Sequence, residues 1–95
     1  MGKHAIRDED FLHRNVDRSR RILFFIRSYT DSFRYCPSFR EIGTSVGITS
    51  TSLIAYYVTN LTEAGYLSNT RGITRSTHVS EKGMEFLKEW KGALG

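Results

Sequence analysis

The sequence predicts a mainly α-helical domain with one small β-hairpin. Apolar residues recur at helical spacing in successive segments, and capping residues and glycines separate those segments. Two short β-prone segments flank a polar stretch near the C-terminal end. The chain has 95 residues, of which 39% are hydrophobic. That composition suits one packed core and speaks against a disordered chain.

The first predicted helix runs from residue 19 to about residue 33. Its apolar stripe has spacings of i, i+4, i+7 and i+11 and consists of Ile22, Ile26, Tyr29 and Phe33. The helix has to end before Pro37, because the residue ahead of a proline is displaced from the helical region. For residues 1–18 the sequence leaves open a short amphipathic helix or a loose arm.

A capping box predicts a second, short helix that starts at Ser38. The Ser38 hydroxyl can accept from the amide of Glu41, and the Glu41 side chain can accept from the amide of Ser38. The residues expected to face inward are Phe39, Ile42 and Val46. Gly47 can take the left-handed conformation that closes the helix.

A third helix is predicted from about residue 51 to residue 64, after a hydroxyl in the segment 48–50 that can cap it. Its inward positions are Ile54, Val58 and Leu61, and Gly65 ends it. Two helices joined by a short glycine-containing turn are typical of a helix-turn-helix, whose second helix can enter the major groove of DNA.

Two short strands are predicted at residues 66–68 and 77–79, with Gly72 between them. A hairpin directly after the second helix of a helix-turn-helix is a wing. A last helix, capped by Ser80, is predicted through Trp90, with a stripe of Met84, Leu87 and Trp90. The predicted organisation is an arm or short helix at 1–18, a winged helix-turn-helix at 19–79, and a C-terminal helix at 80–95 as a possible dimerisation element.

The distribution of charge favours an anionic partner. The formal net charge is +4 and the pI about 9.5. Residues 18–75 carry eight arginines, no lysine and three acidic residues, which gives this segment a charge of +5. The planar guanidinium suits bidentate phosphate contacts, although a solvated basic face without a partner is the alternative.

Other classes of function find no support in the residues. The single cysteine, Cys36, allows neither an internal disulfide nor a thiolate zinc cluster, and the three histidines are scattered. No paired carboxylates, serine–histidine arrangement or phosphate-binding glycine loop stands out. We therefore expect no enzymatic activity, no cofactor, no metal, no small-molecule ligand and no membrane insertion, with the cytoplasm as the default location.

Four segments add a resemblance: ILFFIRSY at 22–29, PSFREIG at 37–43, GITSTS at 47–52 and LTEAGYL at 61–67. In order, spacing and residue type they resemble the N-terminal DNA-binding domain of the LexA repressor family, over about residues 19–75. The resemblance implies a winged helix-turn-helix that binds double-stranded DNA. It implies a sequence-specific transcriptional regulator, most simply a repressor that acts by operator occlusion.

The chain departs from that family in three places. LexA-like repressors carry a C-terminal self-cleaving domain, for which a chain ending at Gly95 has no room, so we expect no self-cleavage. Arg34 stands where the family often has glycine, and we expect a differently shaped turn there. Residues 77–87 resemble instead the wing exit and following helix of MarR-like and PadR-like regulators, where the terminal helix often serves dimerisation.

The resemblance assigns candidate DNA contacts residue by residue. Base contacts are expected from Ser52, Leu53, Ala55, Tyr56 and Asn60 on the third helix. Phosphate contacts are expected from Ser38, Arg40, Ser50, Thr51, Arg71 and Arg75. Two alternatives stay open on the third helix: Leu53 and Tyr57 could belong to the core, and Tyr56 could be an ordinary surface residue. Arg20, Arg21 and Arg27 on the first helix could also flank the DNA backbone, or be merely solvated.

Two further expectations concern partners. We expect a homodimer, because one winged helix reads too few base pairs to select a site in a genome. The expected interface is the terminal helix, with Met84, Phe86, Leu87, Trp90 and Leu94; a rival surface is Phe11, Leu12 and Val16, and Leu87 and Trp90 could instead cap the core of the monomer. The alternative function is a winged-helix adaptor or subunit that contacts protein.

Overall fold

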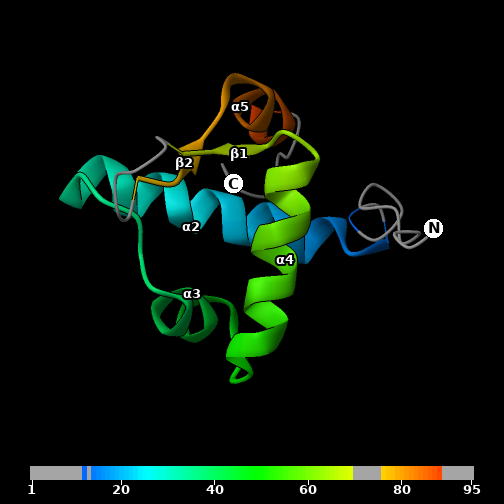
Figure 1. Cartoon of the computed structure of the whole chain (residues 1–95). Helices are drawn as coiled ribbons and strands as arrows, with labels where there is room; N and C mark the ends of the chain where they lie inside the picture. Colours follow the sequence, from blue (N-terminus) through cyan, green and yellow to red (C-terminus); the bar gives the residue numbers. More distant parts are fainter. Residues whose placement is uncertain (1–11, 13, 70–75, 89–95) are drawn as a thin grey trace.

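The computed structural model describes residues 12, 14–69 and 76–88. The elements in chain order are α2 (Val16–Phe33), α3 (Phe39–Val46), α4 (Thr51–Glu63), β1 (Leu67–Ser68), β2 (His78–Val79) and α5 (Glu81–Lys88). The prediction of a mainly helical domain with a small hairpin is therefore confirmed. In Figure 1, α2 crosses the middle of the molecule, α3 lies below it, and the hairpin and α5 lie above. Helix α4 runs across α2 from the level of α3 to the hairpin.

Helix α2 begins at Val16, three residues before the predicted start. Leu12, ahead of the helix, is only 2% exposed and belongs to the core, so it is not available as the rival dimer surface. Arg34 closes α2 with a φ of 70°, and its amide donates to the carbonyl of Thr30 at 2.8 Å. Arg34 therefore adopts the left-handed conformation that glycine takes most readily. An arginine at this position therefore ends the helix in the way that a glycine would.

The caps of the next two helices agree with the prediction. The Ser38 hydroxyl accepts from the amide of Glu41 at 3.1 Å, and the carboxylate of Glu41 accepts from the amide of Ser38 at 2.8 Å. Gly47 ends α3 with a φ of 79°, and the Ser50 hydroxyl caps α4 by accepting from Leu53 at 3.1 Å. Two residues expected on apolar helix faces are exposed, Phe33 in the last turn of α2 and Phe39 in the first turn of α3, because both lie at helix ends outside the core cluster.

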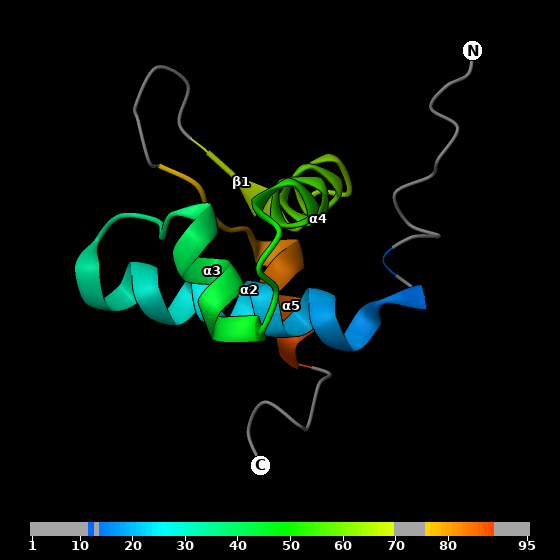
Figure 2. The ribbon, with the colours of Figure 1, turned by 90° about the horizontal axis from the view of Figure 1, so that it is seen from below.

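The core lies where α2, α3 and α4 meet, and it extends to the hairpin and α5. Its buried members are Leu12, Ile22, Leu23, Ile26, Ile42, Ile54, Tyr57, Leu61, Leu67 and Leu87. Seen from below in Figure 2, α3 lies in front of α2, α4 is seen nearly end-on beside them, and α5 lies behind α2. None of the described helices is long and apolar enough to cross a membrane.

The hairpin is antiparallel and pairs Leu67 with Val79 and Ser68 with His78. Its loop, which carries the predicted phosphate contacts Arg71 and Arg75, lies outside the described residues. The Ser80 hydroxyl caps α5 by accepting from the amide of Gly83 at 3.1 Å.

Helix α5 packs on its own domain. Leu87 is buried and Phe86 stacks on Tyr66, so the apolar side of the described part of α5 is occupied within the protomer. For Leu87, the structure thus agrees with the alternative expectation, in which this residue covers the core of its own monomer. Met84 is exposed, and Trp90 and Leu94 lie outside the described residues.

Candidate nucleic-acid interface

The turn between α3 and α4 is set by a close approach at Gly43. A Cβ atom at this position would lie 2.3 Å from the carbonyl oxygen of Ile48, which no real side chain tolerates. The Ile48 amide also donates to the Gly43 carbonyl at 2.8 Å. The absence of a side chain at Gly43 thus allows α3 to contact the turn that leads into α4, and this contact fixes the angle between the two helices.

Glu41 connects the first turn of α3 to α2. Besides capping the helix, its carboxylate accepts from the hydroxyl of Tyr29 at 3.1 Å. Partial burial, together with hydrogen bonds to Tyr35 and Glu41, raises the pKa of Tyr29 to about 12. The neutral tyrosine therefore stays in place as a donor, and it holds the start of α3, with Ser38 and Arg40, against the long helix.

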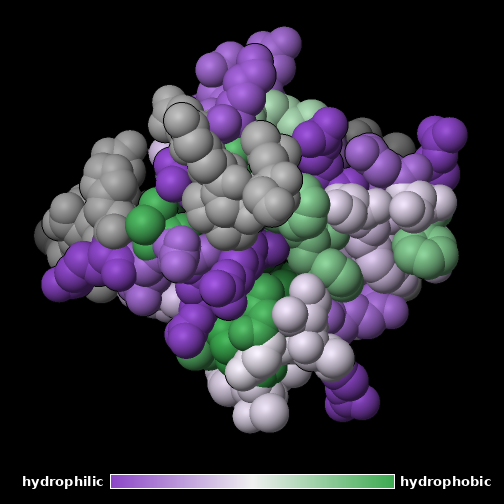
Figure 3. Space-filling view, turned by 180° about the vertical axis from the view of Figure 1, so that it is seen from behind, coloured by the Kyte–Doolittle hydropathy of each residue, from purple (hydrophilic) through white to green (hydrophobic). Residues whose placement is uncertain are grey.

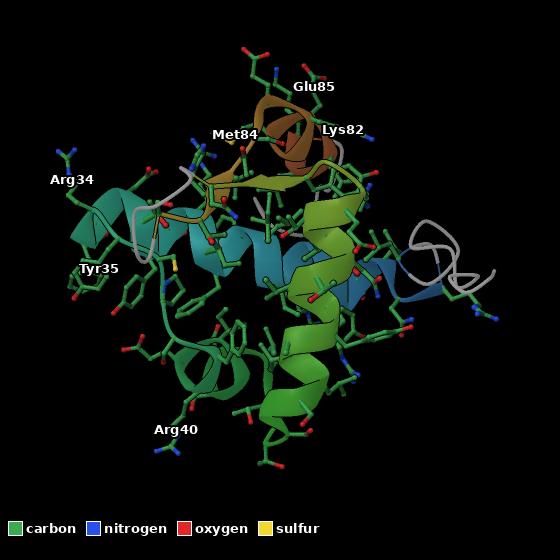
Figure 4. The ribbon with its side chains drawn as sticks, in the orientation of Figure 1. Arg34, Tyr35, Arg40, Lys82, Met84 and Glu85 are labelled. Atoms are coloured by element: carbon green, nitrogen blue, oxygen red, sulfur yellow. The ribbon has the colours of Figure 1, made fainter. Side chains whose placement is uncertain are left out.

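Arg40 and the start of α4 face the same end of the molecule. In Figure 4 the Arg40 side chain points outward at the end where α4 begins, far from α5. Between them lies an open hollow of about 580 Å³, lined by Arg40, Gly43, Thr44, Gly47, Ile48, Thr49 and Thr51. One guanidinium, the side chains of three threonines and the first residue of α4 thus border one space. Such a set of groups suits a phosphate.

The outer face of α4 exposes Ser52 and Tyr56. Ala55 and Leu53 are half-buried. Leu53 contacts the core, in agreement with the alternative that it is a core residue. Tyr57 is a fully buried core residue. The exposed candidates for base contact on this helix are therefore Ser52 and Tyr56.

Asn60 is the site residue that the structure contradicts. Its side chain is only 4% exposed, so it cannot reach a base edge from this position. Its Nδ2 atom is buried and has no hydrogen-bond partner among the residues that the structure describes. The helical spacing from Tyr56 suggested the outer face, but packing covers this last part of α4.

Two of the three arginines considered on α2 have partners within the chain. The guanidinium of Arg20 lies 4.4 Å from the centre of the Phe86 ring, and Arg27 forms an exposed ion pair with Asp31 at 3.7 Å. Arg21 lines a second hollow, with Phe24 and Phe25, between α2 and α3. Sequence reasoning missed these contacts because they depend on residues that are distant in the chain or on the choice of rotamer.

The geometry defines a class of protein. Two helices meet at a tight glycine turn, the second exposes one face along its first turns, and a hairpin follows it directly. This is the arrangement of a winged helix-turn-helix DNA-binding domain.

Comparison with known families identifies the particular one. The family described as "LexA DNA binding domain" matches residues 15–76, and the chain belongs to it. The resemblance read from the sequence is confirmed by this match.

Curated relatives of this chain carry the name LexA repressor. LexA repressor 1 of Nocardia farcinica is 38% identical over 76 residues, which cover 76% of this chain and 35% of that protein. The LexA repressor of Mycolicibacterium paratuberculosis is 44% identical over 64 residues, or 67% of this chain and 28% of that protein. The chain thus spans about a third or less of the length of these relatives. No solved structure matches the chain.

Proposed function

We propose that this chain is a sequence-specific regulator that binds double-stranded DNA and represses transcription by occluding an operator. The observation that carries the proposal is the hollow that Arg40, in the first turn of α3, and Thr51, at the start of α4, line together. Ser52 and Tyr56 are exposed on the turns of α4 that follow Thr51, and the threonines of the hollow place hydroxyls beside the Arg40 guanidinium. The relatives named LexA repressor support repression as the outcome of binding.

The proposed contacts divide into two sets. Ser38, Arg40, Ser50 and Thr51 hold phosphates through side chains and helix-terminal amides, which positions the domain without reading sequence. Ser52 reads base edges by hydrogen bonding, while Tyr56, Ala55 and the rim of Leu53 offer apolar contact to a thymine methyl. The wing residues Arg71 and Arg75 are proposed to reach phosphates or a narrow minor groove.

Helix α4 has neither arginine nor lysine. Bidentate readout of guanine therefore cannot come from this helix, and the preferred site should be rich in A·T pairs.

Selection of bound duplexes from a random pool, followed by affinity measurement on the winning sequence, tests the proposal. We expect an A·T-rich preference and an affinity that falls steeply between ~50 and ~200 mM salt, since each phosphate contact releases counterions. Failure to enrich any sequence, or binding that is independent of salt, would contradict it.

We also propose that two copies bind one inverted repeat, with half-sites about one helical turn apart, because a single domain reads few base pairs. Sedimentation of the chain with a duplex that carries one or two half-sites would measure this. A single copy bound to the two-half-site duplex at saturating concentration would count against it.

Contact with protein is the second candidate function, and exposed aromatic rings favour it. Phe33, Tyr35 and Phe39 lie exposed where α2 ends and α3 begins, and Phe24 borders the hollow between the same helices. Figure 3 shows hydrophobic side chains at the surface on the face opposite to that of Figure 1. An adaptor would use the exposed rings and would not need the cation at Arg40.

A further inference from the structure

The start of α5 is bonded to the segment where α4 ends and β1 begins. The Lys82 ammonium donates to the carbonyl oxygen of Ala64 at 2.7 Å. The Ser80 hydroxyl donates to the carbonyl of Gly65 at 2.5 Å, and the Ser80 amide donates to the carbonyl of Tyr66 at 3.0 Å. Residues 80–82 thus bind the three successive backbone carbonyls of residues 64–66. We call residues 64–66 the elbow. Ala64 is the C-cap residue of α4, and a carbonyl at a helix end has no partner within the helix, so Lys82 of α5 supplies the partner of this carbonyl.

A stack of rings and cations strengthens the same junction. The rings of Tyr66 and Phe86 are stacked, with centroids 4.5 Å apart and planes inclined by 12°. The Lys82 ammonium lies 5.0 Å from the centre of the Tyr66 ring, and the Arg20 guanidinium lies 4.4 Å from that of Phe86. Since Arg20 belongs to α2, the stack connects α5, the elbow and α2 through attraction of cations to ring faces.

Gly83 allows α5 to approach the hairpin. A Cβ atom there would lie 2.3 Å from the carbonyl oxygen of Tyr66 and 2.7 Å from a methyl group of Val79. Any larger residue would push the helix away from the elbow and from β2. The close contact is therefore built into the sequence of α5.

The hairpin cannot set its own direction. It has two residue pairs, and an isolated two-stranded hairpin is at best marginally stable. Its orientation relative to α4 has to come from what packs around its base. The family match ends at residue 76, so the helix that binds the base lies beyond the matched segment.

We propose that α5 is a positioning element, which fixes the angle at which the hairpin leaves α4 so that the recognition helix and the wing engage the same duplex. Lys82 is its positioning residue: it acts through the Ala64 carbonyl and the Tyr66 ring, at the end of the molecule remote from Arg40 (Figure 4). The proposal rests on the proposed function for its consequence in DNA binding, but the orientation of the hairpin can be measured without DNA.

The test compares three variants of the full chain. Lys82→Met removes the hydrogen bond to Ala64 and the cation over Tyr66 while keeping a long side chain. Lys88→Met removes the same charge from an exposed position of the same helix and controls for the general loss of attraction to DNA. Lys82→Arg should restore the contact, because a guanidinium both donates to a carbonyl and stacks on a ring.

Residual dipolar couplings of the amides in β1 and β2, compared with those of α4, report the angle at the elbow. We expect them to change in Lys82→Met and to match the unsubstituted chain in the other two variants. Affinity for the selected duplex, measured well below each unfolding midpoint, should fall about five-fold more in Lys82→Met than in Lys88→Met, or ~1 kcal/mol.

Couplings that stay unchanged in Lys82→Met, or couplings that change without the extra loss of affinity, would overturn the positioning role. Failure of Lys82→Arg to restore both measurements would do so as well. An unsubstituted chain that binds no duplex would refute the proposed function, while the couplings would still decide whether α5 sets the angle of the hairpin.

Discussion

Replacement of Gly43 by alanine tests the geometry of the turn, because two opposing effects meet at this position. In the middle of a helix, alanine is favoured over glycine by about 1 kcal/mol, so helix propensity alone predicts a more stable protein. The new Cβ would, however, lie 2.3 Å from the Ile48 carbonyl oxygen, about 1 Å short of ordinary contact at 3.4 Å. That oxygen is backbone and cannot rotate away.

The steric cost should exceed the gain. Overpacking of this kind typically costs ~1–3 kcal/mol, and α3 would also have to move away from the Ile48 amide that it binds at 2.8 Å. We expect a net destabilisation of about 1–2 kcal/mol, which corresponds to a fall of roughly 5–15 °C in the unfolding midpoint of a domain of this size. Thermal unfolding followed by circular dichroism at the helix band measures it.

Two variants separate the causes. Thr44→Ala lies next in the same helix at an exposed position and gains propensity without a clash, so its midpoint should stay equal or rise. In Gly47→Ala the new Cβ meets no atom within 4 Å, but the backbone at residue 47 has a φ of 79°. The expected loss of ~1 kcal/mol in stability is therefore purely conformational. A midpoint for Gly43→Ala at or above that of the unsubstituted chain would refute the assignment of Gly43 as the contact that sets the turn.

Three further predictions concern the start of α3 and the outer face of α4. Ser38→Ala removes an N-cap and should cost ~1 kcal/mol in chemical denaturation, whereas a loss below about 0.3 kcal/mol would argue against the cap. In the folded protein the pKa of Tyr29 is raised from 10 to about 12. The neutral side chain therefore contributes fully to the free energy of unfolding below pH 10, and this contribution is lost as the pH rises toward 12. Absorbance at the tyrosinate band should show one late-ionising residue that Tyr29→Phe removes; an unchanged titration in that variant would contradict the shift. Arg40→Ala should weaken binding to all duplexes alike and lower the salt slope by about one, while Tyr56→Ala should relax preference at one base position by ~1–3 kcal/mol. Equal losses for both variants on every sequence would remove the distinction between the two roles.

The sequence was sufficient where the cause of structure is local. Ser38 and Glu41 stand three residues apart, so the capping box could be recognised and is confirmed. Gly47 ends its helix through its own backbone freedom. The motifs of the helix-turn-helix consist of such neighbouring residues, and the family match follows the same segment.

The burial of α4 side chains was only partly predictable. Ile54 and Leu61 are buried as their spacing indicated. Asn60 lies one turn after the exposed Tyr56, and the helical period alone placed both residues on the outer face. Which side of a helix is covered at a given turn depends on the element that packs there. The sequence periodicity does not contain that information.

What the sequence by itself determined is therefore the order, caps and approximate ends of the helices, together with the family. The tertiary structure alone decided which candidate contacts remain exposed, that Glu41 binds Tyr29, and that Lys82 binds the end of α4 across 18 residues of chain. The physical reason is one of range: capping and helical periodicity act between residues within about one turn. Contacts between distant residues form only once the core has fixed the positions of the helices that carry them.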